Sequence, residues 1–106
     1  MNPAANNPNP KEMTSMYDRM ETLAQSFPTL RSAPGTQPWD PEQLDTWAVG
    51  PAPGHGAFCA ARFVLAVWNS TAEWKCGTFD LMEALACWDR EHCAAFLEWA
   101  REPWWP

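Results

Sequence analysis

Residues 56–68, with the sequence GAFCAARFVLAVW, constrain the fold of this chain more than any other segment. Its four alanines favour a helix, and on a helical projection nearly every direction is apolar. A helix that is apolar all round is a buried one, so we expect this segment at the centre of the domain. The alternative is a mixed fold, because Val64–Val67 alone could form a short buried strand.

Arg62 is the only charged residue in this segment. A charged side chain on a buried helix needs a carboxylate partner or a path along its stem to solvent. We therefore expect Arg62 to pair with an acidic residue of the C-terminal helices. Cys59 is expected to pack as a small hydrophobic side chain.

Around this centre the sequence predicts four main short helices, which gives a small all-α domain over residues 13–106. Residues 1–12 (MNPAANNPNPKE) have too few apolar side chains to bury and are predicted to form a flexible N-terminal tail. Apolar residues at three- and four-residue spacing, together with capping residues, delimit the helices. The predicted helices are 13–27, ending before a proline; 41–50, capped by Asp40; 79–88, capped by Thr78; and 90–102, capped by Asp89.

The predicted inner faces of the last two helices contain most of their large apolar side chains. These residues are Leu81, Met82, Ala84, Leu85 and Trp88 on the first helix, and His92, Cys93, Phe96, Leu97, Trp99 and Ala100 on the second.

The net charge of −6 disfavours a nucleic-acid partner, because neutralising phosphates requires clustered Lys and Arg and only seven are present. The sequence shows no secretory signal, which would have a basic start followed by an apolar core. Its apolar runs are also too short to span a bilayer. We therefore expect a cytoplasmic protein whose four cysteines are thiols and whose partner is another protein.

The segment Thr78–Pro106 ends on two adjacent tryptophans, Trp104 and Trp105. If exposed, they would form an aromatic patch beside Glu98 and Glu102, and such patches serve as hot spots in protein interfaces. These four residues are the predicted partner-binding site. The alternative, which the aggregation risk of exposed indoles favours, is that the tail folds back over the core. In that case Trp39 and Trp74 would complete the same aromatic cluster.

A metal or thiol site built from Cys76, Cys87, His92 and Cys93 is the second hypothesis. Their spacing matches no zinc knuckle, and neighbouring positions on a helix point about 100° apart, so separate thiols are the favoured interpretation. Cys87 is expected on the same helix side as Asp80 and Glu83. Nearby acids raise a thiol pKa, which disfavours a reactive thiolate there.

No catalytic or cofactor-binding fingerprint occurs in the sequence. A small hydrolytic or thiol enzyme around His92 and a cysteine is therefore the third hypothesis, and His55 is expected to be solvated or to cap a helix. The leading prediction is a non-enzymatic protein-interaction or regulatory module, without a cofactor or metal.

Overall fold

The computed structural model describes residues 10–106, with side chains from residue 15 onward. This part of the chain contains no strand and forms α1 (Pro10–Gln25), the 3-10 helix η2 (Pro28–Leu30), α2 (Pro41–Ala48), α3 (His55–Trp68), α4 (Leu81–Cys87) and α5 (Arg90–Arg101). The predicted all-α class is thus confirmed, and the alternative strand at Val64–Val67 is wrong because these residues lie within α3. The predicted tail falls mostly on residues 1–9, outside the described residues, while 10–12 already belong to α1.

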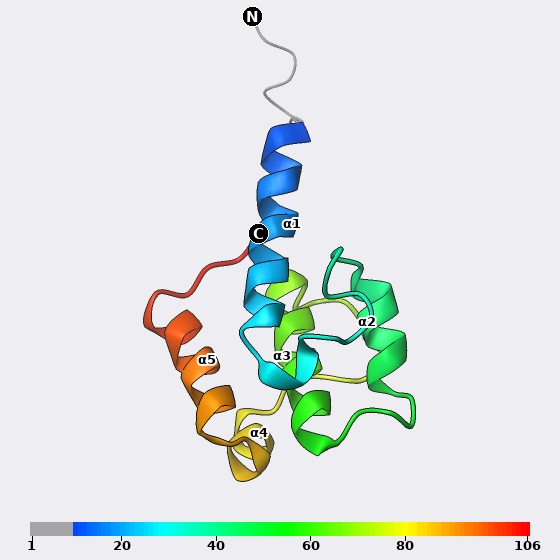
Figure 1. Cartoon of the computed structure of the whole chain (residues 1–106), viewed down its shortest axis with the longest axis vertical. Helices are drawn as coiled ribbons and strands as arrows, with labels where there is room; N and C mark the ends of the chain where they lie inside the picture. Colours follow the sequence, from blue (N-terminus) through cyan, green and yellow to red (C-terminus); the bar gives the residue numbers. More distant parts are fainter. Residues whose placement is uncertain (1–9) are drawn as a thin grey trace, which may run out of the picture.

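Helix α3 is the buried centre of the domain, as expected. Eight of its residues are buried, and α1, η2, α2 and α4 all pack against it (Figure 1). The ring of Phe63 packs edge-on against Phe27, Phe79, Phe96 and Trp99, with ring centroids 5.1–5.7 Å apart. One side chain thus connects α3 to α5 and to the segments that follow α1 and precede α4.

Aspartates define where three helices begin. Asp40, Asp80 and Asp89 each accept a hydrogen bond from the backbone N–H three residues later, at 3.2, 3.0 and 2.9 Å. Each carboxylate accepts a hydrogen bond from a backbone N–H of the first turn that has no partner within the helix. Its negative charge is also favourable at the N-terminus of a helix. The predicted caps Asp40 and Asp89 are confirmed. Thr78 is not a cap, because α4 starts at Leu81 and Asp80 takes that position.

The predicted inner face of α4 is wrong for three residues. Leu81, Met82 and Leu85 are 38%, 74% and 45% exposed, and only Ala84 is buried within this seven-residue helix. The helix ends before Trp88, whose extended backbone lets its indole turn into the core on its own. The prediction extended this helix to Trp88 and took the side that carries Trp88 as the buried side, which placed the exposed side of α4 inward. On α5, Leu97 is likewise 56% exposed.

A buried carboxylate fixes the long connector between α3 and α4. Asp45 of α2 is 5% exposed and accepts hydrogen bonds from the backbone N–H groups of Lys75 (2.8 Å) and Cys76 (2.9 Å). These contacts hold the connector against α2 and so determine where the chain enters α4. None of the helices in residues 10–106 is both long enough and apolar enough to cross a membrane.

Candidate functional site

The two C-terminal tryptophans lie in different environments. Trp104 is half-buried against the core, and the guanidinium of Arg19 stacks over its ring at 4.1 Å. Trp105 is 61% exposed and stands perpendicular to the ring of Trp99, with 5.5 Å between the centroids. The Trp99 indole N–H donates to the Trp104 carbonyl (3.0 Å), which holds the C-terminal segment to α5, and the segment then runs toward α1 (Figure 1). The C-terminal segment therefore folds back so that Trp104 packs against the core, while Trp105 stays exposed.

Trp39 and Trp74 do not join this C-terminal group. Trp39 is buried and packs edge-on against Trp68, at 5.6 Å between centroids. Trp74 donates its indole N–H to the Asn69 carbonyl at 3.0 Å. The single aromatic cluster of the fold-back alternative is therefore divided between separate parts of the domain.

A groove of about 480 Å³ lies between α1 and α5, and three of the four predicted partner-binding residues line it. Glu98 of α5, together with Glu102 and Trp104 just after that helix, lines one side of the groove. Asp18 and Arg19 of α1 line the other side. The groove thus combines aromatic surface with three carboxylates and one guanidinium. Trp105, the fourth predicted residue, is not part of this lining.

The structure distributes the second predicted set, Cys76, Cys87, His92 and Cys93, over separate places. Cys76 is buried at the connector beside Asp45, which accepts a hydrogen bond from its backbone N–H. Cys93 is half-buried and packs against the hydrophobic core. Cys87 is exposed at the end of α4.

His92 is buried and uses both of its ring nitrogens within the fold. Its Nδ1 lies 2.7 Å from an Oδ1 of Asp89, and its Nε2 lies 2.7 Å from the hydroxyl of Thr29. The imidazole therefore connects the start of α5 to η2. These contacts are those of a structural histidine, whose partners are a carboxylate and a hydroxyl.

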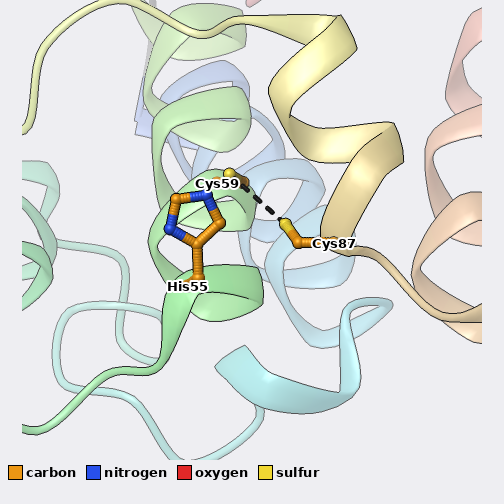
Figure 2. Close-up of side chains that lie close together, drawn as sticks. All are labelled: His55, Cys59 and Cys87. Carbon is orange, nitrogen blue, oxygen red and sulfur yellow. Dashed lines mark hydrogen bonds between the residues drawn. The ribbon is translucent and has the colours of Figure 1, made fainter.

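Cys87 instead meets two residues of α3, and the three form the thiol–imidazole cluster of His55, Cys59 and Cys87 (Figure 2). Their donor atoms lie within 4.8 Å of one another, and the two sulfurs are 3.7 Å apart. Among the described residues this is the only group of three or more His, Cys, Asp or Glu side chains that could hold a metal ion.

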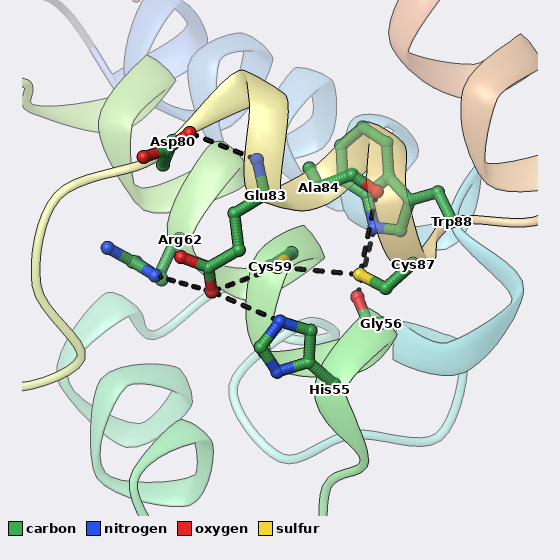
Figure 3. A network of polar contacts seen from close by, with 9 residues as sticks. All are labelled: His55, Gly56, Cys59, Arg62, Asp80, Glu83, Ala84, Cys87 and Trp88. Atoms are coloured by element: carbon green, nitrogen blue, oxygen red, sulfur yellow. Dashed lines mark hydrogen bonds and ion pairs between the residues drawn. The ribbon is translucent and has the colours of Figure 1, made fainter.

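Glu83 borders this cluster and links it to Arg62 (Figure 3). Its Oε2 lies 3.1 Å from the His55 Nε2, accepts from the Cys59 thiol at 3.7 Å and pairs with the Arg62 Nη1 at 3.3 Å. The expected carboxylate partner of Arg62 in the C-terminal helices is thereby confirmed. The Trp88 indole N–H donates to the Gly56 carbonyl at 3.0 Å and closes the adjoining side.

The Cys59 thiol is a poor nucleophile in this setting. Burial raises its pKa to about 12, and the neighbouring Cys87 and Glu83 act in the same direction. A thiol with such a pKa is protonated at neutral pH, whereas nucleophilic cysteines need a stabilised thiolate. The cluster therefore does not have the electrostatics of a cysteine nucleophile.

Sequence reasoning missed His55, Cys59 and Glu83 because it compared cysteine spacings along the chain with linear zinc knuckles. The available signal was helical instead. His55 and Cys59 are four residues apart on α3, and Glu83 and Cys87 are four residues apart on α4. Each pair lies on one face of its helix, but only the packing of α3 on α4 brings the two faces together.

No protein-family model, curated protein or solved structure shows significant similarity to this chain.

Proposed function

We propose that this protein is a non-enzymatic protein-interaction module that binds a basic segment of a partner protein in the α1–α5 groove. The observation that carries the proposal is the stacking of the Arg19 guanidinium on Trp104, at 4.1 Å from the ring centroid. A cation over an indole face is attracted by the negative π surface. The wall of the groove therefore already holds the kind of group that the proposed partner would insert.

Charge complementarity supports a basic partner. Three carboxylates, those of Asp18, Glu98 and Glu102, line the groove against the single guanidinium of Arg19. The whole chain carries a net charge of −6, which adds a long-range attraction for cationic segments. An acidic or phosphorylated segment would meet repulsion here, so the proposed ligand is a peptide rich in Arg or Lys.

Preorganisation supports the same surface. Trp99 binds the Trp104 carbonyl, so the indole of Trp104 is already positioned before a partner arrives. Fixing an aromatic anchor in advance lowers the entropy cost of binding. We place this function in the cytoplasm, where the four cysteines would stay reduced as thiols.

The test is a fluorescence-anisotropy titration with a labelled, unstructured peptide of alternating Arg and Ser, compared with its Gln–Ser counterpart. We expect tighter binding of the Arg peptide, and a loss of tenfold or more in the Trp104→Ala variant, as for an interface anchor. The Glu98→Gln/Glu102→Gln variant should lose a few-fold in affinity, with a weaker salt dependence.

Glu91→Gln is the matched control, because Glu91 is exposed on the same helix but does not line the groove. This variant makes the same Glu-to-Gln change once, outside the groove, and should bind almost as the wild type does. Equal affinity for the two peptides, or unchanged binding by the Trp104→Ala variant, would refute the proposal.

A further inference from the structure

Two pairs of potential metal ligands face each other across the α3–α4 contact. His55 and Cys59 lie one turn apart on α3, and Glu83 and Cys87 lie one turn apart on α4. Figure 2 shows the imidazole and the two thiols pointing toward one another from these helices. Residues from two helices thus converge at one point, and neither of these helices lines the groove that contains Trp104.

The spacing of the sulfurs matches what a tetrahedral zinc ion requires. Zinc–thiolate bonds are about 2.3 Å long, and two of them at the tetrahedral angle hold their sulfurs about 3.8 Å apart. The sulfurs of Cys59 and Cys87 are 3.7 Å apart. An ion could therefore bind between them with little movement of either helix.

Glu83 provides an oxygen beside the same point. Its Oε2 is 3.1 Å from the Nε2 of His55 and 3.7 Å from the sulfur of Cys59. Carboxylate oxygen, imidazole nitrogen and thiolate sulfur are all ligands that zinc accepts in proteins. His55, Cys59 and Cys87 already converge, and Glu83 lies beside them as the fourth donor that a closed, four-coordinate structural site needs.

Arg62 completes the charge balance of the cluster. Two thiolates and one carboxylate carry three negative charges, of which a zinc ion neutralises two. The third is offset by Arg62, whose Nη1 pairs with Glu83 and whose guanidinium lies 5.0 Å from the ring centroid of Phe58. A hydrogen-bonded partner of this kind orients a ligating carboxylate, as outer groups do in known metal sites.

We propose that His55, Cys59, Cys87 and Glu83 bind one zinc ion, which joins α4 to α3. On binding, the two thiols release their protons to solvent and form zinc–sulfur bonds. This link between the helices would have a structural role, because α4 has only seven residues and Ala84 is the only buried one among them. A helix this short is not stable by itself, so a metal that connects it to the central helix stabilises its position.

The test uses the full, reduced and metal-free protein, titrated with Co²⁺ as a spectroscopic probe and then with Zn²⁺. We expect one ion per chain in native mass spectrometry. Bound Co²⁺ should show the intense visible bands of a tetrahedral ion and a sulfur-to-cobalt charge-transfer band, and Zn²⁺ should abolish both.

Cys87→Ser and His55→Ala are the informative variants, because both side chains are exposed and their replacement leaves the core intact. Each should bind zinc at least tenfold more weakly, with an unchanged far-ultraviolet circular dichroism spectrum. Cys93→Ser makes the same thiol-to-hydroxyl change outside the cluster and should bind zinc as the wild type does.

Absence of the cobalt bands in the wild type would overturn the proposal, as would equal zinc affinity in the Cys87→Ser variant. Glu83→Gln tests the fourth ligand and should also weaken zinc binding at least tenfold. An unchanged affinity in that variant would overturn the assignment of Glu83. Because peptide binding involves other residues, either proposal can fail without the other.

Discussion

Replacing Asp45 by alanine should destabilise the fold more than its single carboxylate suggests. Both carboxylate oxygens are used: Oδ2 accepts from the Lys75 N–H at 2.8 Å and Oδ1 from the Cys76 N–H at 2.9 Å. Hydrogen bonds to a charged group contribute about 1.5–3 kcal/mol each. The Lys75 N–H can turn to water after the change, but the Cys76 N–H stays buried without a partner.

From these contacts we expect Asp45→Ala to lower the free energy of unfolding by about 2–5 kcal/mol. For a domain of this size each kcal/mol corresponds to roughly 4–8 °C in Tm. Asp45→Asn keeps one acceptor oxygen and should lose about half as much. Urea denaturation followed by tryptophan fluorescence, together with calorimetry, gives both quantities.

Glu42→Ala is the control, because Glu42 is exposed on the same helix, and its loss should stay within about 0.5 kcal/mol. The cysteine beside Asp45 gives a second readout. Burial and the neighbouring Asp45 raise the pKa of Cys76 to about 12, so Asp45→Asn should lower that pKa and speed alkylation of Cys76 at alkaline pH. A loss below about 1 kcal/mol in Asp45→Ala would refute the connector's dependence on these two bonds.

Three further outcomes are expected. Gly35→Ala should be strongly destabilising, because Gly35 has φ +84° and an added Cβ would lie 2.5 Å from the Asp40 carbonyl oxygen. Gly54→Ala should cost much less, because its Cβ would enter open space and only the N-cap preference of α3 would be lost; equal denaturation midpoints for the two variants would contradict this. The hydrogen bond from the backbone N–H of His92 lowers the pKa of Asp89. The ionised carboxylate therefore stabilises the fold above the ordinary carboxyl pKa, and this stability should be lost as the pH falls below that value. In a plot of Tm against pH, Asp89→Asn should show a smaller decrease at acidic pH. Because the pKa of Cys76 is raised, its protonated thiol gives stability that is complete below pH 9 and is lost as the pH rises from 9 toward 12. Cys76→Ala should therefore lose less stability at alkaline pH than the wild type. An identical decrease of Tm with alkaline pH in both proteins would contradict the raised pKa.

The sequence predicted the features that depend on residues close together in the chain, namely the central helix and two helix N-caps. The central helix follows from the apolar composition of residues 56–68, and two N-caps follow from aspartates placed just before apolar periodicity. The partner of Arg62 was predictable as a class of residue, because a charge near the core needs an opposite charge. Its identity as Glu83 depends on how α4 packs.

The candidate sites needed tertiary information. The exposed side chains of α4 could not be predicted, because Trp88 leaves the helix and enters the core separately, and helical periodicity assumes that it does not. The thiol–imidazole cluster could not be assembled either, since Cys59 and Cys87 are 28 residues apart and meet only through the packing of two helices. The groove similarly joins α1 to the far end of the chain.

The packing around Phe63 sets the order in which this protein can acquire its structure. The aromatic partners of this ring come from positions 27, 79, 96 and 99, on both sides of it in the sequence. During synthesis, α3 leaves the ribosome with only the first of these partners beside it. The apolar surface of α3 therefore stays incompletely covered until α5 has emerged, and this interval is when the nascent chain is most prone to aggregation.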